Sequence, residues 1–160
     1  MANEKELELG KKIYEDLCQG LDTQDWKYDR HDEDLTITMG MRGDDLPVEI
    51  IARVNAAAQV VSIFSVLPVK VPDEKKVDIA MAICIANNGL VNGAFDLDLE
   101  KGRIVWRLCT TYRGSLLGNE AYHYMVVVSA STVDKYNDRF LMLAKGMIDL
   151  EKFVELENQN

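Results

Sequence analysis

Apolar and polar side chains alternate along two neighbouring stretches of the chain, residues 35–42 and 48–54. A period of two is typical of a β-strand that buries one face and leaves the other exposed. A shorter strand is expected over 26–31, and another over 60–67, where both faces are apolar and Pro68 ends the run. The alternating apolar positions are Leu35, Ile37, Met39 and Met41 in the first stretch and Val48, Ile50, Ala52 and Val54 in the second.

Three other stretches have a helical period. Residues 4–20 repeat apolar side chains every fourth position, residues 73–88 are apolar almost all round, and residues 119–157 alternate apolar steps of four and three. The last helix either bends at Gly146 or docks its final turns on a neighbouring subunit. We expect the break, because glycine costs about 1 kcal/mol in a helix interior, and we expect residues after Ile148 to lie outside the core.

A β-hairpin is expected between the second and third helices. With Lys101-Gly102 as a two-residue turn, apolar side chains oppose each other on one face and acids oppose bases on the other. This register predicts an antiparallel pair with one buried face. The expected pairs are Leu99 with Ile104, Leu97 with Trp106, Phe95 with Leu108, Glu100 with Arg103 and Asp96 with Arg107.

The order of elements is α-ββββ-α-ββ-α. Runs of strands between helices, rather than strict alternation of strands and helices, favour an α+β fold in which helices pack on an antiparallel sheet. The chain of 160 residues is 48% hydrophobic and 28% charged, which is ordinary for a globular protein. We therefore expect one domain over residues 1–160.

Charge and cysteine content limit the partners and the compartment. The net charge of −9 repels phosphate groups, so we expect neither nucleic acid nor a membrane as a partner. No run of about 18 apolar residues is present, and no charged leader precedes an apolar segment. The three cysteines, Cys18, Cys84 and Cys109, lie far apart among apolar neighbours, which predicts buried free thiols and a cytoplasmic protein.

The end of the second helix and the hairpin carry a family resemblance. The stretch runs through an Asn-rich turn, a glycine, Phe-x-Leu-Asp, an acidic glycine turn and an apolar strand. It resembles the YbjN-like domain family, which shares the type III secretion chaperone-like fold. The matching residues are Asn87, Asn88, Gly93, Phe95, Leu97, Asp98, Gly102, Val105 and Trp106.

The resemblance covers about 40 residues well and the rest of the chain by element order alone. Members of the family are described as candidate sensory transduction regulators. More distant relatives are dimeric chaperones that hold unfolded secreted proteins. The resemblance thus implies protein binding and brings no catalytic residues with it.

Candidate chemical sites are few. Asp96, Asp98 and Glu100 form an acidic row, but it opposes arginines in the expected hairpin, so we interpret it as a salt-bridged surface rather than a metal site. His31 lies among carboxylates without a second histidine or cysteine at ligand spacing. No nucleophile, phosphate-binding loop or dinucleotide motif is present. We therefore expect no catalysis, no metal and no cofactor.

The strongest functional signal is surplus apolar surface. A sheet covered on one side needs one apolar face, yet the strand at 60–67 is apolar on both. Such a surface usually marks a partner site, unless the long C-terminal helix folds back over it. The residues that we assign to a partner or dimer interface are Val60, Phe64, Val66, Val105, Trp106 and Cys109.

Two functional hypotheses follow from these observations. The first is a non-catalytic protein-interaction module, chaperone-like or a signalling regulator, which forms a homodimer and binds a protein or peptide client. The alternative is a small-molecule sensor with a pocket between the sheet and the C-terminal helix, gated by the loop at 114–118.

Overall fold

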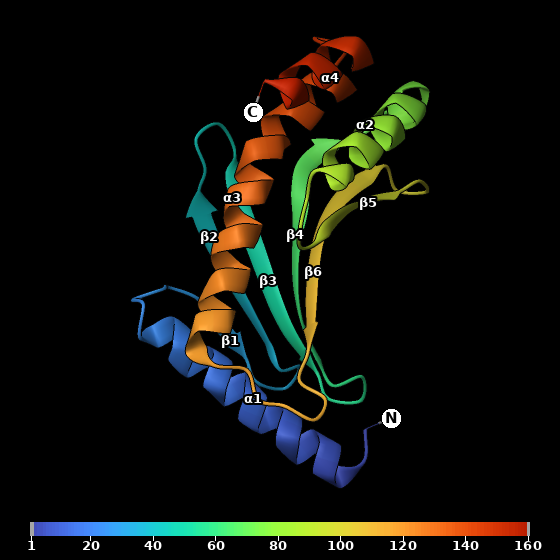
Figure 1. Ribbon diagram of the computed structural model, residues 1–160. Coiled ribbons are helices and arrows are strands. Elements are labelled where there is room, and N and C mark those ends of the chain that lie inside the picture. The colour runs from blue at the N-terminus through green and yellow to red at the C-terminus, as the bar shows by residue number, and fades with distance from the viewer. Residues whose placement is uncertain (1, 160) are drawn as a thin grey trace.

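The computed structural model describes residues 2–159 and shows a six-stranded antiparallel sheet in the order β1-β2-β3-β4-β6-β5 with helices packed on it (Figure 1). The fold is α+β, as the element order predicted. Met1 and Asn160, the ends of the expected domain, lie outside the described residues. The elements are α1 (Glu4–Asp22), β1 (Asp29–His31), β2 (Thr36–Arg42), β3 (Pro47–Asn55), β4 (Val60–Lys70), a 3-10 turn η1 (Asp73–Lys75), α2 (Lys76–Asn88), β5 (Ala94–Asp98), β6 (Arg103–Thr111), α3 (Asn119–Ala144) and α4 (Leu150–Asn158).

The helices cover one face of the sheet. Strand register places Ile37, Ala52, Ile63 and Leu108 in one row across β2, β3, β4 and β6, and all four side chains are buried. Helix α3 runs diagonally over this face, with α1 near one of its ends and α2 and α4 near the other (Figure 1). The hydrophobic core therefore lies between this face and the helices.

The sheet divides into two wings. Pairing between β3 and β4 extends only from Asn55–Val60 to Ile51–Phe64, although both strands continue beyond these residues. Past this point the β2–β3 hairpin diverges from β4, β6 and β5 (Figure 1). The tip of the hairpin is attached to α3, because the Asp44 backbone N–H donates to Asp134 Oδ1 at 2.9 Å.

The C-terminal helix breaks where the sequence predicted. Helix α3 ends at Ala144, Gly146 adopts a φ of +69°, and α4 begins at Leu150. The expectation that residues after Ile148 lie outside the core was wrong. The Phe153 ring is fully buried and stacks on the Phe140 ring, with 5.6 Å between the ring centroids. Helix α4 therefore folds back and completes the core of its own chain.

The hairpin register differs from the expected one by two residues. Phe95 opposes Trp106, Asp96 opposes Val105, and a four-residue loop replaces the two-residue turn. The Asp98 carboxylate accepts the Lys101 backbone N–H at 2.9 Å, which closes the wider turn. Because the shift is an even number of residues, every side chain keeps its predicted face. Leu99, however, has no cross-strand partner and is 59% exposed.

One strand also ends later than expected. Pro68 lies inside β4 rather than after it, at an irregularity in the pairing with β6 between Val66 and Lys70. Proline has no N–H to donate, and an interruption of the ladder is where a strand tolerates it.

We expect Trp106→Ala to lower the free energy of unfolding by about 3–5 kcal/mol, because the indole is fully buried against Phe95 at 5.1 Å. Val105→Ala is the matched control on the other face of the same strand, where the side chain is already partly exposed, and should cost about 1 kcal/mol or less. Denaturant unfolding monitored by circular dichroism measures both. Equal losses would contradict the assignment of faces.

Candidate partner-binding surface

The face of the sheet opposite the helices, called here the open face, carries an apolar centre. Register aligns Ile51 of β3 with Phe64 of β4, and Val66 of β4 with Val105 of β6. All four side chains are only partly buried, and Val66 is 38% exposed. We call Ile51, Phe64, Val66 and Val105 the open-face patch. It crosses three adjacent strands.

The patch arises from the composition of β4. Val61, Ile63 and Ser65 point into the core and are buried, so Phe64 and Val66 must point the other way. In a strand that is apolar on both faces, the second face is normally covered as well. Within residues 2–159, the helices pack on the first face only.

Five of the six residues that the sequence assigned to an interface lie together on the open face. Val60, Phe64 and Val66 lie in β4, and Val105 and Cys109 lie in β6. The sixth, Trp106, was wrongly assigned: it lies next to Val105 in sequence, so the period of two turns its side chain into the core, where it is fully buried.

Sequence reasoning missed Ile51 as part of this surface. The signal was present in the sequence, because Ile51 stands between the charged residues Glu49 and Arg53 at the outward positions of an alternating strand. Both charged side chains are exposed in the structure. The prediction of buried thiols also fails for two cysteines. Cys84 and Cys109 are exposed and only Cys18 is buried.

Charged groups surround the open-face patch. Arg107 pairs with Asp96 at 2.9 Å, and this hydrogen bond raises the pKa of the Arg107 guanidinium. Within residues 2–159, Arg53, Asp29 and Glu49 on the same face form no ion pair with another side chain. The open face therefore has unpaired charge at its margins.

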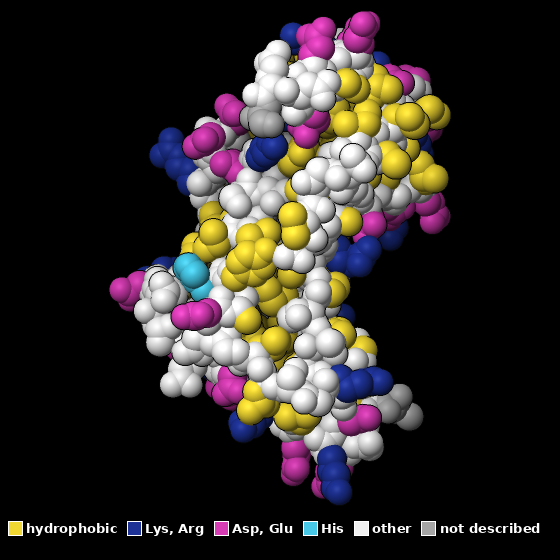
Figure 2. Space-filling view, viewed as in Figure 1, with side chains coloured by type: hydrophobic (Ala, Val, Ile, Leu, Met, Phe, Trp, Pro, Cys, Tyr) yellow, Lys and Arg dark blue, Asp and Glu magenta, His cyan; other side chains and the backbone are white. Residues whose placement is uncertain are grey.

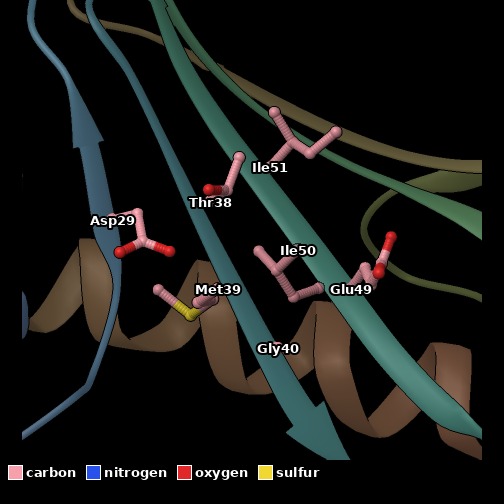
Figure 3. Close-up of a pocket in the computed structure, with 7 residues that line it drawn as sticks. All are labelled: Asp29, Thr38, Met39, Gly40, Glu49, Ile50 and Ile51. Atoms are coloured by element: carbon pink, nitrogen blue, oxygen red, sulfur yellow. The ribbon is translucent and has the colours of Figure 1, made fainter.

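A hollow lies over Gly40, on the β2–β3 wing beside the patch (Figure 3). A Cβ placed on Gly40 would meet nothing within 4 Å, so the missing side chain leaves the backbone bare. The Asp29 carboxylate lies between β1 and β2 at one side of the hollow, whereas Glu49 lies on the far side of β3 (Figure 3). The hollow, called here the Gly40 hollow, measures about 280 Å³ and is lined by Asp29, Thr38, Met39, Gly40, Glu49, Ile50 and Ile51.

A second exposed apolar area lies on α2. Val77 is 75% exposed and Met81 is 51% exposed, and Cys84 follows them on the same side of the helix. We call these three residues the outer α2 face. Apolar side chains gather over α2 in Figure 2. No charged residue occurs from Ile79 to Asn88, so this surface is apolar and uncharged along most of the helix.

The Asn-rich turn that follows this helix has a clear structural role. The Asn87 side chain accepts the Phe95 backbone N–H at 2.8 Å and donates to the Phe95 carbonyl at 3.0 Å. This pair of hydrogen bonds fixes the end of α2 to β5, and with it the position of the outer α2 face.

The candidate metal ligands lie apart and are used locally. The His31 ring Nε2 is 3.1 Å from Thr38 Oγ1, Asp96 pairs with Arg107, and the N–H of Lys101 lowers the pKa of the Asp98 carboxyl by donating to it. Within residues 2–159 no three histidine, cysteine or acidic side chains form a group that could hold a metal ion. The same residues include no helix long and apolar enough to cross a membrane.

The space between the sheet and α3, where the sensor hypothesis places a pocket, is filled by side chains. Tyr122, Val126 and Phe140 of α3 are fully buried against the core. A hollow of about 150 Å³ occurs between α3 and the tip of the β2–β3 hairpin. This volume is well below the roughly 300–1,000 Å³ of ordinary ligand pockets.

Comparison with known proteins identifies the fold. No family model and no curated protein sequence matches the chain. Among solved structures, YbjN from E. coli, described as a candidate transcription regulator, superposes with a TM-score of 0.61 at 10% identity, over 84% of this chain and 92% of that one. A chain of the HopA1–SchA chaperone–effector complex superposes with a TM-score of 0.57 at 12% identity, over 81% of this chain and 95% of that one.

This protein has a YbjN-like, chaperone-like fold. The resemblance inferred from the second helix and the hairpin is therefore confirmed at the level of the fold. At 10–12% identity the likeness does not transfer a partner or an activity.

We expect Cys109 to react rapidly with a thiol reagent in the native protein, because it is exposed on the open face. In a Cys84→Ser variant, one thiol per chain should react at once and the other, Cys18, only after unfolding, because burial shields it and raises its pKa. Cys84→Ser/Cys109→Ser is the control and should show no rapid reaction. If no thiol of the folded Cys84→Ser variant reacts rapidly with the reagent, Cys109 is covered.

Proposed function

We propose that this protein is a non-catalytic interaction module that binds a protein partner or peptide on its open face. The observation that carries the proposal is the open-face patch, which crosses three strands and is left uncovered by residues 2–159. Contiguous exposed apolar surface on a folded protein usually marks an interaction site.

Binding would be driven by burial of the patch. Each 100 Å² of apolar surface removed from water contributes about 2.5 kcal/mol, before the cost of ordering the partner is subtracted. Unpaired backbone groups along the outer edge of β2 past Thr38 offer further hydrogen bonds, because β1 pairs with β2 only as far as that residue. The partner is thus expected to be an extended segment.

The relatives in fold support a protein partner. One of the two solved structures is a chaperone–effector complex, in which a protein of this fold is found with another protein. We place the protein in the cytoplasm as a chaperone-like factor or a signalling regulator, consistent with three free cysteines. We assign no catalytic residue, because His31, Asp96 and Asp98 already have local partners.

We further propose that two copies associate through the outer α2 face. A chain with a net charge of −9 repels its own copies over most of its surface. The stretch Ile79–Asn88 has no charge, and Met81 and Cys84 expose apolar surface there. A second copy can therefore meet this surface without opposing like charges, and the open face stays free for the partner.

Partner binding should depend on the open-face patch. We expect Val66→Arg to reduce capture of the partner from host cells at least tenfold, because a charge in the centre of the patch opposes burial. Leu116→Arg is the matched control, since Leu116 is 63% exposed in the loop before α3. Quantitative mass spectrometry of affinity-purified samples measures the effect. A partner retained equally by both variants would place its site elsewhere.

Self-association should depend on the outer α2 face. Light scattering at tens of micromolar should give twice the 18.1 kDa chain mass for the wild type and the single-chain mass for Met81→Glu. Leu116→Glu adds the same charge outside this face and should stay dimeric. A monomeric wild type would refute the dimer, and a dimeric Met81→Glu variant would refute this interface.

A further inference from the structure

We infer that the Gly40 hollow selects the partner by taking the side chain of a lysine or arginine, while an apolar side chain of the same segment lies on the open-face patch. This inference rests on the proposed function and specifies the chemistry of the partner. It concerns the margin of the open face rather than its apolar centre, and it commits to a basic and apolar segment as the occupant.

The shape of the hollow fits one side chain. The side chains of Thr38 and Ile51 lie beside the bare backbone of Gly40, and Ile51 is also the cross-strand neighbour of Phe64. At about 280 Å³ it is smaller than the pockets that hold drug-sized ligands. A long, flexible side chain from a segment already bound to the patch can enter it from the open side.

The charge around the hollow favours a cation. Asp29 and Glu49 have no side-chain partner among residues 2–159, whereas Asp32 and Asp96, also near the sheet, each pair with an arginine. Two bases lie near the hollow on the open face: Arg42, two residues beyond Gly40 along β2, and Arg53, two residues beyond Ile51 along β3. Arg42 opposes Pro47 and Arg53 opposes Thr36, and neither forms an ion pair with Asp29 or Glu49. The excess of 27 acidic over 18 basic residues in the chain adds to the attraction.

The mixed lining favours lysine or arginine over a small cation. Both side chains combine an apolar stem with a charged end, and such stems pack along apolar surface while the charge stays in water. Here Ile51 and the Gly40 backbone face the stem, and Asp29 at the rim faces the charged end (Figure 3). The two carboxylates lie on different sides of the hollow and do not converge as metal ligands do.

Sheet geometry sets the spacing between the two anchors. Gly40 lies two strands away from Phe64 across the sheet and two residues along it. With about 4.8 Å between strands and 3.3 Å per residue, the separation is about 12 Å. An extended segment spans this distance in about four residues, and side chains four apart share a face. The expected partner motif is therefore an apolar residue and a basic residue four positions apart.

A random-peptide display library selected against the wild-type protein tests the motif. Selected peptides that compete with one another should carry a lysine or arginine four residues from a large apolar residue. Their binding should be lost in Val66→Arg, which shows that they occupy the open face. A synthetic peptide of the consensus sequence is then the probe for affinity measurements by calorimetry.

A double-mutant cycle assigns the basic residue to the hollow. Asp29→Asn should weaken binding of the consensus peptide roughly two- to fivefold, the range of an exposed ion pair. The peptide with norleucine in place of lysine should bind wild type and Asp29→Asn equally. Glu8→Gln on α1 removes the same charge from an exposed position far in sequence from the hollow, and should leave affinity unchanged.

Gly40→Val separates binding from folding. A valine side chain would project into the hollow and cover the bare backbone, yet its Cβ meets nothing within 4 Å and the position lies inside a strand, which valine favours over glycine. We expect this variant to unfold at equal or higher denaturant concentration than wild type and to bind the consensus peptide at least tenfold more weakly.

The outcomes distinguish this inference from the proposed function. Peptides that need Val66 but show no basic residue, or that respond equally to Asp29→Asn and Glu8→Gln, would overturn the Gly40 subsite and leave the interaction module standing. Failure to select any peptide that depends on Val66 would overturn both.

Discussion

An aromatic cluster joins the layers of this molecule. Trp106 of β6 contacts Phe95 of β5 at 5.1 Å, Phe95 contacts Phe140 of α3 at 5.2 Å, and Phe140 stacks on Phe153 of α4. The Trp106 ring also lies against the backbone of Gly93. A Cβ at that position would approach the ring to 2.3 Å, so only glycine fits there. Because these rings hold α3 and α4 against the face of β5 and β6 that carries Phe95 and Trp106, the C-terminal helices pack on that face, and the other face stays open.

The arrangement explains how an acidic chain keeps apolar surface without losing its fold. The core is complete without the open face, since the side chains of β4 and β6 that point toward the helices are already buried. Phe64, Val66 and Val105 do not belong to this core.

Much of this architecture could be predicted from local sequence. Apolar residues that repeat every two or about every 3.6 positions located the strands and the helices. The free-energy cost of a glycine inside a helix located the break at Gly146. The hairpin register could not be settled in this way, because the two-residue and four-residue turns give the same faces and only the hydrogen bond from Lys101 to Asp98 decides between them. The Trp106 error came from grouping apolar neighbours without applying the period of two.

The candidate site was predictable only in part, for a different reason. Apolar residues such as Phe64 and Val66 indicate an exposed apolar surface, because β4 carries more of them than a single core needs. The Gly40 hollow gives no such signal, since it consists of a missing side chain bounded by Asp29 and Ile51 from two other strands. The return of α4 onto Phe140 likewise depends on contacts between distant segments.

The division of the sheet beyond Ile51 and Phe64 has a mechanical consequence. No strand pairing holds the β2–β3 wing to β4 past that point, so the wing is positioned through α3, to which Asp134 ties it at Asp44. Gly40 lies two residues past the last β3–β4 pair, so its position relative to β4 depends on helix packing on the opposite side of the molecule as well as on the strand pairing at Ile51 and Phe64. Under the proposed function, substitutions on α3 that never touch the partner would change what the open face binds, so the covered side could evolve specificity for the exposed one.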